Sequence, residues 1–232
     1  MKLQSELRAR FKSAADPERA PQMEAYMKNR MRFYGVPAPL VKAVCRETFK
    51  GVEFKDQSEW LKLARELWDT AKRREEWYAT IQLCEHRSAR AFQDLAAMPL
   101  YEHFIVTGAW WDVVDVLASH HVGNIHKKFP KEMKPLMRAW SVSDDLWKRR
   151  TSILSQLSFG EETDLSHLYA CIKPSLASKE FFLQKAIGWA LRQYAWVDPK
   201  ETLRYVRQNE SRLAPLSKRE ALKNIVRKKA AK

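Results

Sequence analysis

The sequence predicts an all-α protein in which short amphipathic helices follow one another along the whole chain. Only 6 of the 232 residues are glycine, which argues against a sheet-rich fold with many tight turns. Helix-start signals recur from end to end, and no alternating apolar–polar run indicates a strand. Because 45% of the residues are hydrophobic, the chain has enough apolar material for a core, and we expect one domain over residues 1–232.

Four segments have the residue order that begins a helix. At Asp16 and Asp198, an oxygen acceptor precedes a proline and then an acidic residue within the first turn. The segments that begin at Asp56 and Ser217 have the spacing of capping boxes. Together with apolar residues at helical spacing, these signals predict helices over residues 2–14, 17–31, 38–49, 58–69, 73–87, 91–106, 111–119, 131–141, 144–157, 164–174, 179–195, 199–209 and 217–229.

The charge of the chain indicates what kind of partner it binds. Lysine and arginine number 42 against 28 acidic residues, a formal charge of +14. Such a surplus favours a polyanion: nucleic acid first, and an anionic membrane or an acidic protein second. The N-terminus has no secretory signal, and the most apolar stretch, residues 104–118, is too short and too charged to cross a bilayer. The 3 cysteines stand far apart and are expected to be reduced core thiols of a cytoplasmic protein.

Pairs of the predicted helices return about every 35–45 residues, which is the period of HEAT or armadillo units. Each helix has one apolar stripe and must bury it on its neighbours. The pattern therefore predicts a HEAT-like superhelix, a solenoid whose concave basic face is long enough to hold a DNA duplex. A compact helical bundle is the alternative. The tail from Lys223 is basic and rich in alanine, and its last few residues are expected to fray.

The most unusual segment of the chain is the run from Trp110 to Asp115, Trp-Trp-Asp-Val-Val-Asp. On a helix, Trp111 and Asp115 are four residues apart and share a face, as do Trp110 and Val114. One face then presents an indole beside a carboxylate. The alternative is that both tryptophans belong to the core and that both acids cap the helix or pair with arginines.

Two further segments combine aromatic and basic residues. Near Trp147, Arg149 and Arg150 cannot point the same way, so one is expected to pair with an acid or a phosphate; the alternative is a solvated basic face. Farther on, Gly188 inside a predicted helix costs on the order of 1 kcal/mol relative to alanine, which is accepted where something approaches closely. Trp189 would then lie over a ligand, or Gly188 would pack against another helix with Trp189 buried.

Other kinds of chemistry have no support in the sequence. His120, His121 and His126 cluster, but no acid or cysteine stands at metal-ligand spacing, so no metal site is predicted. There is no glycine-rich phosphate loop, no Gly-x-Ser-x-Gly and no Cys/His nucleophile pair. No metal or organic cofactor is therefore expected.

Taken together, the motifs resemble the AlkD family of DNA glycosylases, HEAT-like-repeat proteins of alkylation repair. The resemblance rests on their order: Trp-Trp-Asp-x-Val-Asp, then Trp-x-x-Arg, then Phe-Phe-x-Gln-Lys-Ala-Ile-Gly-Trp-x-Leu-Arg, then Leu-Ser-Lys-Arg-Glu-Ala. It also includes the early segment Glu-Ala-Tyr-Met-Lys-Asn, residues 24–29, and so spans nearly the whole chain.

The resemblance implies a role for each matching residue. Asp115 would be the catalytic carboxylate, and Arg150 would hold that carboxylate and the nearby DNA backbone. Trp111 and Trp189 would pack on the lesion nucleotide and its deoxyribose, and Tyr26 would line the same cleft. The further candidates for contacts to DNA or the lesion are Lys28, Trp110, Arg149, Arg192, Lys218, Arg219 and Lys223. Lys148 and Arg149 stand beside Arg150, so the sequence leaves open which of the three contacts DNA.

The resemblance also implies the reaction: hydrolysis of the N-glycosidic bond of cationic purines alkylated at N3 or N7, such as 3-methyladenine and 7-methylguanine, in duplex DNA. The enzyme would be monofunctional, would act as a cytoplasmic (in bacteria, nucleoid-associated) monomer, and would leave the lesion stacked rather than flip it out. Two other interpretations remain open: a non-catalytic helical-repeat module that binds nucleic acid or an acidic protein, and a protein that associates with membrane surfaces through its basic tail.

Overall fold

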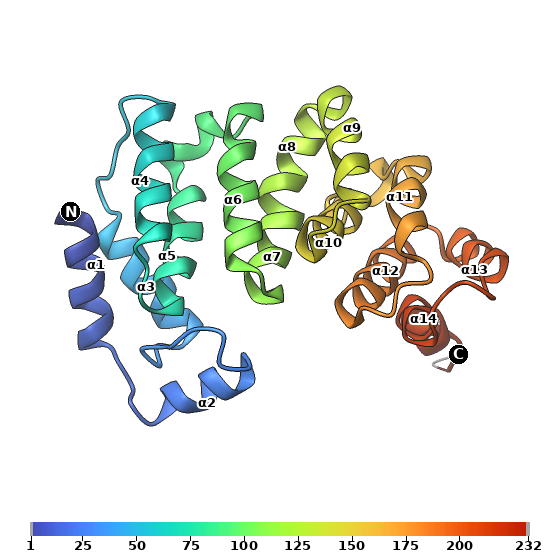
Figure 1. Ribbon diagram of the computed structural model, residues 1–232, viewed down its shortest axis with the longest axis horizontal. Helices are drawn as coiled ribbons and strands as arrows, with labels where there is room; N and C mark the ends of the chain where they lie inside the picture. Colours follow the sequence, from blue (N-terminus) through green and yellow to red (C-terminus); the bar gives the residue numbers. More distant parts are fainter. Residues whose placement is uncertain (1, 231–232) are drawn as a thin grey trace. The chain divides into compact units, whose positions relative to one another are not determined.

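The structure is a computed structural model that describes residues 2–230, with side chains described for residues 2–225. Every regular element of this part of the chain is a helix, which confirms the all-α prediction and is consistent with a helical-repeat fold. The chain divides into two compact units, Met1–Leu100 and Tyr101–Lys232 (Figure 1). A single domain with one concave face stays a prediction. The fraying expected of the last residues concerns residues 231 and 232, which lie outside the described part.

Among its described residues, the N-terminal unit contains five helices, two 3-10 turns and the start of a sixth helix. They are α1 (Lys2–Ser13), α2 (Arg19–Tyr26), α3 (Ala38–Thr48), α4 (Gln57–Asp69), α5 (Arg74–Cys84), the turns Arg87–Phe92 and Leu95–Ala97, and α6 (Met98–Gly108), which continues past the boundary. Helices α1, α3 and α5 pack together, and α4 packs beside α5 (Figure 1). Their apolar stripes meet in a core that includes Phe11, Val41 and Leu83.

A buried carboxylate fixes the loop between α2 and α3. The Glu75 side chain accepts backbone N–H bonds from Tyr34 and Gly35 at 3.0 Å and from Val36 at 3.1 Å. Gly35 has a φ of +87°, and a Cβ at this position would lie 2.1 Å from the carbonyl oxygen of Asp16. Only glycine fits there. The loop is therefore anchored at its α3 end.

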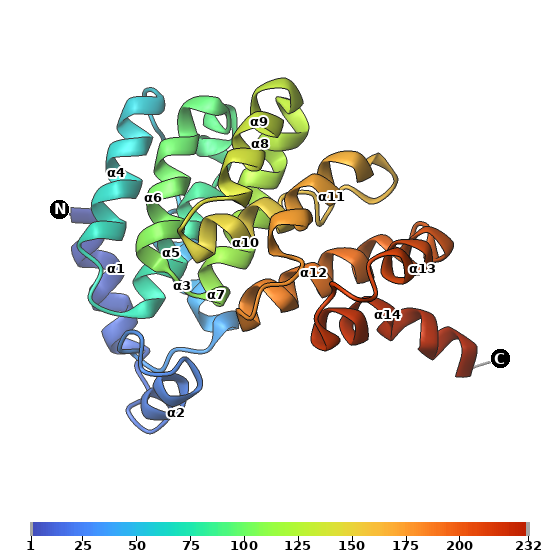
Figure 2. The ribbon, with the colours of Figure 1, turned by 45° about the vertical axis from the view of Figure 1, so that its right-hand side comes forward.

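The C-terminal unit contains the end of α6 and eight further helices among its described residues, with a π-helical segment and two 3-10 turns. They are α7 (Trp111–Val116), the π-helical segment Leu117–Val122, α8 (Gly123–Lys128), α9 (Pro130–Ser141), α10 (Leu146–Leu154), the turn Gly160–Glu162, α11 (Leu165–Ile172), the turn Lys173–Ser175, α12 (Phe181–Tyr194), α13 (Pro199–Gln208) and α14 (Pro215–Ala230). Helix α14 lies along α12, and α10 packs against both α9 and α12 (Figure 2).

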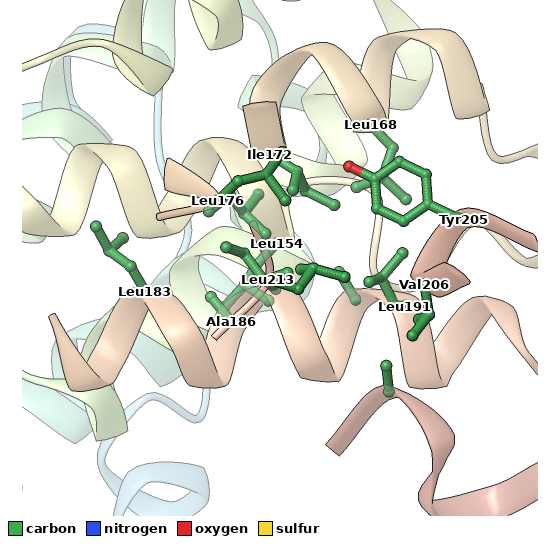
Figure 3. Packing of buried hydrophobic residues seen from close by; sticks show 14 of the residues in the cluster. Leu154, Leu168, Ile172, Leu176, Leu183, Ala186, Leu191, Tyr205, Val206 and Leu213 are labelled. Carbon is green, nitrogen blue, oxygen red and sulfur yellow. The ribbon is translucent and has the colours of Figure 1, made fainter. Parts of the chain in front are cut away.

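The core of the C-terminal unit joins the five consecutive helices α10 to α14. Figure 3 shows Leu154 of α10, Ile172 of α11, and Leu183 and Leu191 of α12 among the converging side chains. Tyr205 of α13 also belongs to this cluster. Burying each large apolar side chain contributes about 1.5–3 kcal/mol, so this cluster holds α10 firmly against α12. These two helices carry Arg150 and Trp189.

Most predicted helix starts are confirmed. Asp56 accepts a bond from the backbone N–H of Glu59, and Asp198 accepts from the N–H groups of Lys200 and Glu201. Asp16 accepts from the N–H of Arg19 at 3.0 Å, but α2 begins only at Arg19 with Glu18 at its N-cap, so the start predicted after Asp16 is two residues too early. Short polar side chains at the N-cap satisfy N–H groups that have no partner within the helix.

Three predicted helices have the wrong extent. The helix predicted over 17–31 ends at Tyr26, because Lys28 and Asn29 take left-handed φ values of 56° and 53°. The helix predicted over 91–106 begins only at Met98, after two 3-10 turns. The helix predicted over 111–119 instead passes through the π-helical segment and continues to Lys128.

The three cysteines and three of the histidines, His121, His126 and His167, are buried in the fold. All three cysteines are buried thiols outside any disulfide, as expected of core cysteines. His126 and His167 are each 1% exposed, and their rings meet edge to face with centroids 5.1 Å apart. Nδ1 of His126 lies 3.2 Å from the hydroxyl of Ser155. Within residues 2–230, no group of three or more His, Cys, Asp or Glu side chains is arranged to hold a metal ion.

We expect this histidine pair to make the protein sensitive to acid. Burial lowers the pKa of His126 and of His167 from 6.5 to about 4, so the unfolded chain binds protons at a higher pH than the folded chain does. Stability is therefore complete above pH 6.5 and falls as the pH drops toward 4, by about 2 kcal/mol per histidine at pH 4.5. Urea unfolding at pH 7.5 and 4.5 measures this loss. His167→Gln should reduce it, whereas His120→Gln, at an exposed histidine, should not.

Candidate active site

A cleft of about 370 Å³ opens on the C-terminal unit. It is lined by Trp111, Asp115, Arg150, Phe181, Phe182, Lys185, Trp189, Arg192 and Glu220. These side chains come from α7, α10, α12 and α14, so the packing of four helices assembles the cleft. Five of the residues predicted from the sequence meet here: Trp111, Asp115, Arg150, Trp189 and Arg192.

Helix α7 presents Asp115 to the cleft. The chain turns at Ala109, whose φ is +32°, and Trp110 is extended, so the helix begins at Trp111. Val113 and Val114 are fully buried and anchor the opposite side of α7. The π-helical segment follows directly after α7. Such segments are frequent at functional sites.

Asp115 and Arg150 form a two-pronged ion pair. Arg150 donates from Nε to Oδ1 of Asp115 at 2.7 Å and from Nη2 to Oδ2 at 2.8 Å. Its Nη1 also donates to the carbonyl oxygen of Phe182, and its guanidinium carbon lies 5.8 Å from the centroid of the Phe182 ring. Because Arg150 is on α10 and Phe182 is on α12, this one side chain ties three helices together at the cleft.

Both side chains of the pair are largely buried, and the carboxylate is the more exposed of the two. The side chain of Arg150 is 5% exposed and that of Asp115 is 15% exposed. Burial raises the pKa of the Asp115 carboxyl, and the two bonds from Arg150 act in the opposite direction. The arrangement holds a carboxylate in a fixed orientation at the wall of an open cleft, where its charge is weakly screened.

The structure distinguishes the three consecutive basic residues of α10. Arg150 binds Asp115. Arg149 donates from Nη2 to the hydroxyl of Ser175 at 3.0 Å. Lys148 pairs with Glu102, and its ammonium lies 5.4 Å from the centroid of the Trp140 ring. A DNA contact by Arg149 stays a prediction.

The two neighbouring tryptophans have different surroundings. Trp111 is half-buried and lines the cleft. Trp110 instead packs edge to face on Phe182, with ring centroids 5.1 Å apart, and lies 6.0 Å from Trp147. It is not among the described residues that line the cleft. Its predicted contact with the lesion therefore has no support from this geometry, and its position matches the packing alternative.

At Gly188 both predicted alternatives, packing against another helix and a tryptophan that faces a ligand site, hold in part. The glycine faces α14, so it serves helix packing. Trp189 beside it is half-buried, touches the core cluster and also lines the cleft. The capping box predicted at Ser217 is wrong, because α14 begins at Pro215 and the Ser217 hydroxyl donates to the carbonyl of Gln184 at 2.9 Å.

The other predicted DNA contacts lie elsewhere. Tyr26 and Lys28 belong to the N-terminal unit, where Tyr26 is 69% exposed at the end of α2. Lys218 is bonded to the carbonyl oxygen of Glu210 at 3.3 Å, and Arg219 and Lys223 are exposed on α14. Their contacts to DNA stay predictions.

Four lining residues were not predicted from the sequence: Phe181, Phe182, Lys185 and Glu220. The spacing of the first three with Trp189 and Arg192 places them along one side of α12, so helical periodicity would have found them. Glu220 had no such signal, since it reaches the cleft only because α14 packs on α12.

Comparison with known proteins identifies the family of the chain. A family model described as DNA alkylation repair enzyme matches residues 7–225. The chain belongs to this family. It is similar to a solved structure described as a predicted DNA alkylation repair enzyme from Enterococcus faecalis, with 30% sequence identity and a TM-score of 0.78 over 90% of this chain and 95% of the other. A search of curated proteins found no match.

The DNA alkylation repair family accounts for the positive charge of the chain, since its members act on DNA. The resemblance seen in the motifs is thus confirmed at the level of alkylation repair, and the AlkD branch within it stays a prediction. Among residues 2–230, no helix has both the length and the apolar character needed to cross a bilayer.

Proposed function

We propose that this DNA alkylation repair enzyme is a monofunctional glycosylase of the AlkD type, which hydrolyses the N-glycosidic bond of purines alkylated at N3 or N7. The observation that carries the proposal is the carboxylate of Asp115, held by Arg150 in the same cleft as the indoles of Trp111 and Trp189. The proposal includes duplex DNA as substrate, a monomeric enzyme in the cytoplasm, and no cofactor.

The chemistry needs little more than this carboxylate. Alkylation at N3 or N7 gives the purine a positive charge, so the base leaves as a neutral molecule with the electron pair of the glycosidic bond. The barrier lies in the sugar, which develops oxocarbenium character as the bond breaks. Asp115 stabilises that charge and orients the water whose oxygen bonds to C1′ and whose proton is released.

Aromatic faces are suited to a cationic lesion. An indole face beside a cation contributes roughly 0.5–2 kcal/mol, more when water is excluded. Trp111 and Trp189 both line the cleft, and Phe181, 56% exposed, lines it too. This set favours charged alkylpurines over neutral bases.

The lining residues also support a lesion that stays stacked in the duplex. Enzymes that flip a base read its Watson–Crick edge through hydrogen bonds. The described lining contains no Asn, Gln, Ser or Thr side chain for such reading, but it contains Lys185 and Arg192, which suit phosphates. Each phosphate that is neutralised should add about 0.9 to the slope of log affinity against log salt.

The test is release of free base from duplex DNA that carries 7-methylguanine, run beside a duplex that carries uracil. We expect the wild type to release 7-methylguanine and to leave uracil in place, because uracil is a neutral and poorer leaving group. Efficient release of uracil would contradict the proposal. Intact DNA binding without release of either base would instead identify a non-catalytic binding module.

A further inference from the structure

Helix α14 rests directly on the backbone of α12 at Gly188. A Cβ at Gly188 would lie 2.5 Å from the Cβ of Glu220 and 3.0 Å from the carbonyl oxygen of Ser217. A side chain at position 188 would therefore push α14 away. Because position 188 has no side chain, Glu220 packs directly against α12 beside the cleft.

From this position Glu220 binds two cations of α12. Lys185 precedes Gly188 by one helical turn and Arg192 follows it by one, so both flank the contact on the same face. Oε1 of Glu220 lies 3.0 Å from Nζ of Lys185, and Oε2 accepts from Nη1 of Arg192. Glu220 is 12% exposed at its side chain, and all three residues line the cleft.

The surroundings keep this carboxylate ionised. Burial opposes ionisation, but the hydrogen bond and charge of Lys185, together with Arg192, hold the pKa of the Glu220 carboxyl below its usual value. Since Asp115 already balances Arg150, the remaining charge of the cleft comes from these three residues. Glu220 therefore lowers the net charge of the cleft from +2 to +1.

We propose that Glu220 is a positioning residue that fixes Lys185 and Arg192 for contacts to the phosphates of the lesion strand and cancels one of their charges, so that a cationic base is tolerated in the same cleft. The inference rests on the proposed function. Two free cations would attract DNA but repel a positively charged purine. Cations held by Glu220 attract the backbone with less repulsion of the base.

The experiment compares Glu220→Gln with Glu132→Gln, which makes the same change at an exposed residue of α9 outside the cleft. The first measurement is the affinity of each protein for a 7-methylguanine duplex relative to undamaged duplex. The second is the single-turnover rate of base release. Thermal unfolding checks that each variant is folded. Glu220→Asp keeps the negative charge and tests whether a carboxylate at this position restores the affinity ratio and the rate.

For Glu220→Gln we expect binding of undamaged duplex to stay equal or to tighten, because the gain of one net positive charge offsets the looser orientation of Lys185 and Arg192. The relative affinity for the cationic duplex and the rate of release should each fall about tenfold. Glu132→Gln should match the wild type, and Glu220→Asp should recover part of both losses. A structural role alone would instead weaken binding to both duplexes together with thermal stability.

An unchanged affinity ratio in Glu220→Gln, or parallel losses on both duplexes, would overturn the inference. If the proposed function itself is wrong, the wild type will release no base, and this result is distinct from a change in the affinity ratio. The affinity ratio would still decide the role of Glu220, because it does not depend on turnover.

Discussion

Replacement of Asp115 by asparagine is expected to slow base release from 7-methylguanine duplex by about two to three orders of magnitude, which is about 3–4 kcal/mol of transition-state stabilisation. Asparagine keeps the shape of the side chain and one acceptor for Arg150, but it removes the negative charge that faces the developing oxocarbenium ion. Binding of undamaged duplex should persist. Single-turnover release and fluorescence anisotropy measure the two quantities separately.

Asp112→Asn is the matched control for this prediction. Asp112 lies on the same helix and undergoes the same change of charge, but it is not among the described residues that line the cleft. We expect it to release base at nearly the wild-type rate. If Asp115→Asn keeps the wild-type rate, the carboxylate has no part in the reaction and the proposed mechanism is wrong.

Replacement of Arg150 by leucine is expected to destabilise the C-terminal unit by about 3–5 kcal/mol. The side chain is 5% exposed and supplies two bonds to Asp115 and one to the carbonyl of Phe182, so its loss leaves a carboxylate without its counter-charge in a largely buried position. Urea unfolding measures the loss. The Arg150→Leu/Asp115→Leu double variant should recover much of it, because no charge is then left without a partner.

The same pair sets the pH dependence of activity. Burial raises the pKa of Asp115 and Arg150 opposes that effect, so removing Arg150 should raise this pKa further. Catalysis needs the ionised carboxylate. The acid limb of the rate profile should therefore move to higher pH in Arg150→Lys, which keeps a cation but loses the two-pronged bond. An unmoved acid limb would show that a group other than Asp115 controls it.

Local signals in the sequence predicted most of the fold. Asp56 and Asp198 begin helices because an N-cap oxygen acts on its own neighbours, whatever the rest of the chain does. The four-residue spacing of Trp111 and Asp115 placed both on one side of a helix for the same reason, and both line the cleft. The early end of α2 had only a weak signal, since Asn29 commonly takes a left-handed φ at a helix end but Lys28 does not.

The rest of the site depends on contacts between helices. Arg149 and Arg150 are chemically identical, and only the packing of α10 against α7 decides that Arg150 meets Asp115. The residues around Glu220 fit a capping box, but the side chain is instead held by cations of α12. The residue pattern of one helix does not predict which residue of another helix a charged side chain will bind.

The π-helical segment has a consequence for how much the length of the chain can vary here. In an uninterrupted α-helix, residues 11 positions apart, such as Asp115 and His126, would point within roughly 20° of each other, because each residue turns the helix by about 100°. The wider π turn takes up an extra residue and turns the two side chains roughly a quarter of a circle apart. The continuous helical segment from α7 to α8 thereby places the carboxylate of Asp115 in the cleft and the imidazole of His126 against α11. After deletion of one residue between Leu117 and Val122, a regular α-helix would still leave the two groups roughly a quarter of a circle apart, because ten positions at about 100° each give that angle. The chain can therefore lose one residue here without turning either group away from its partner.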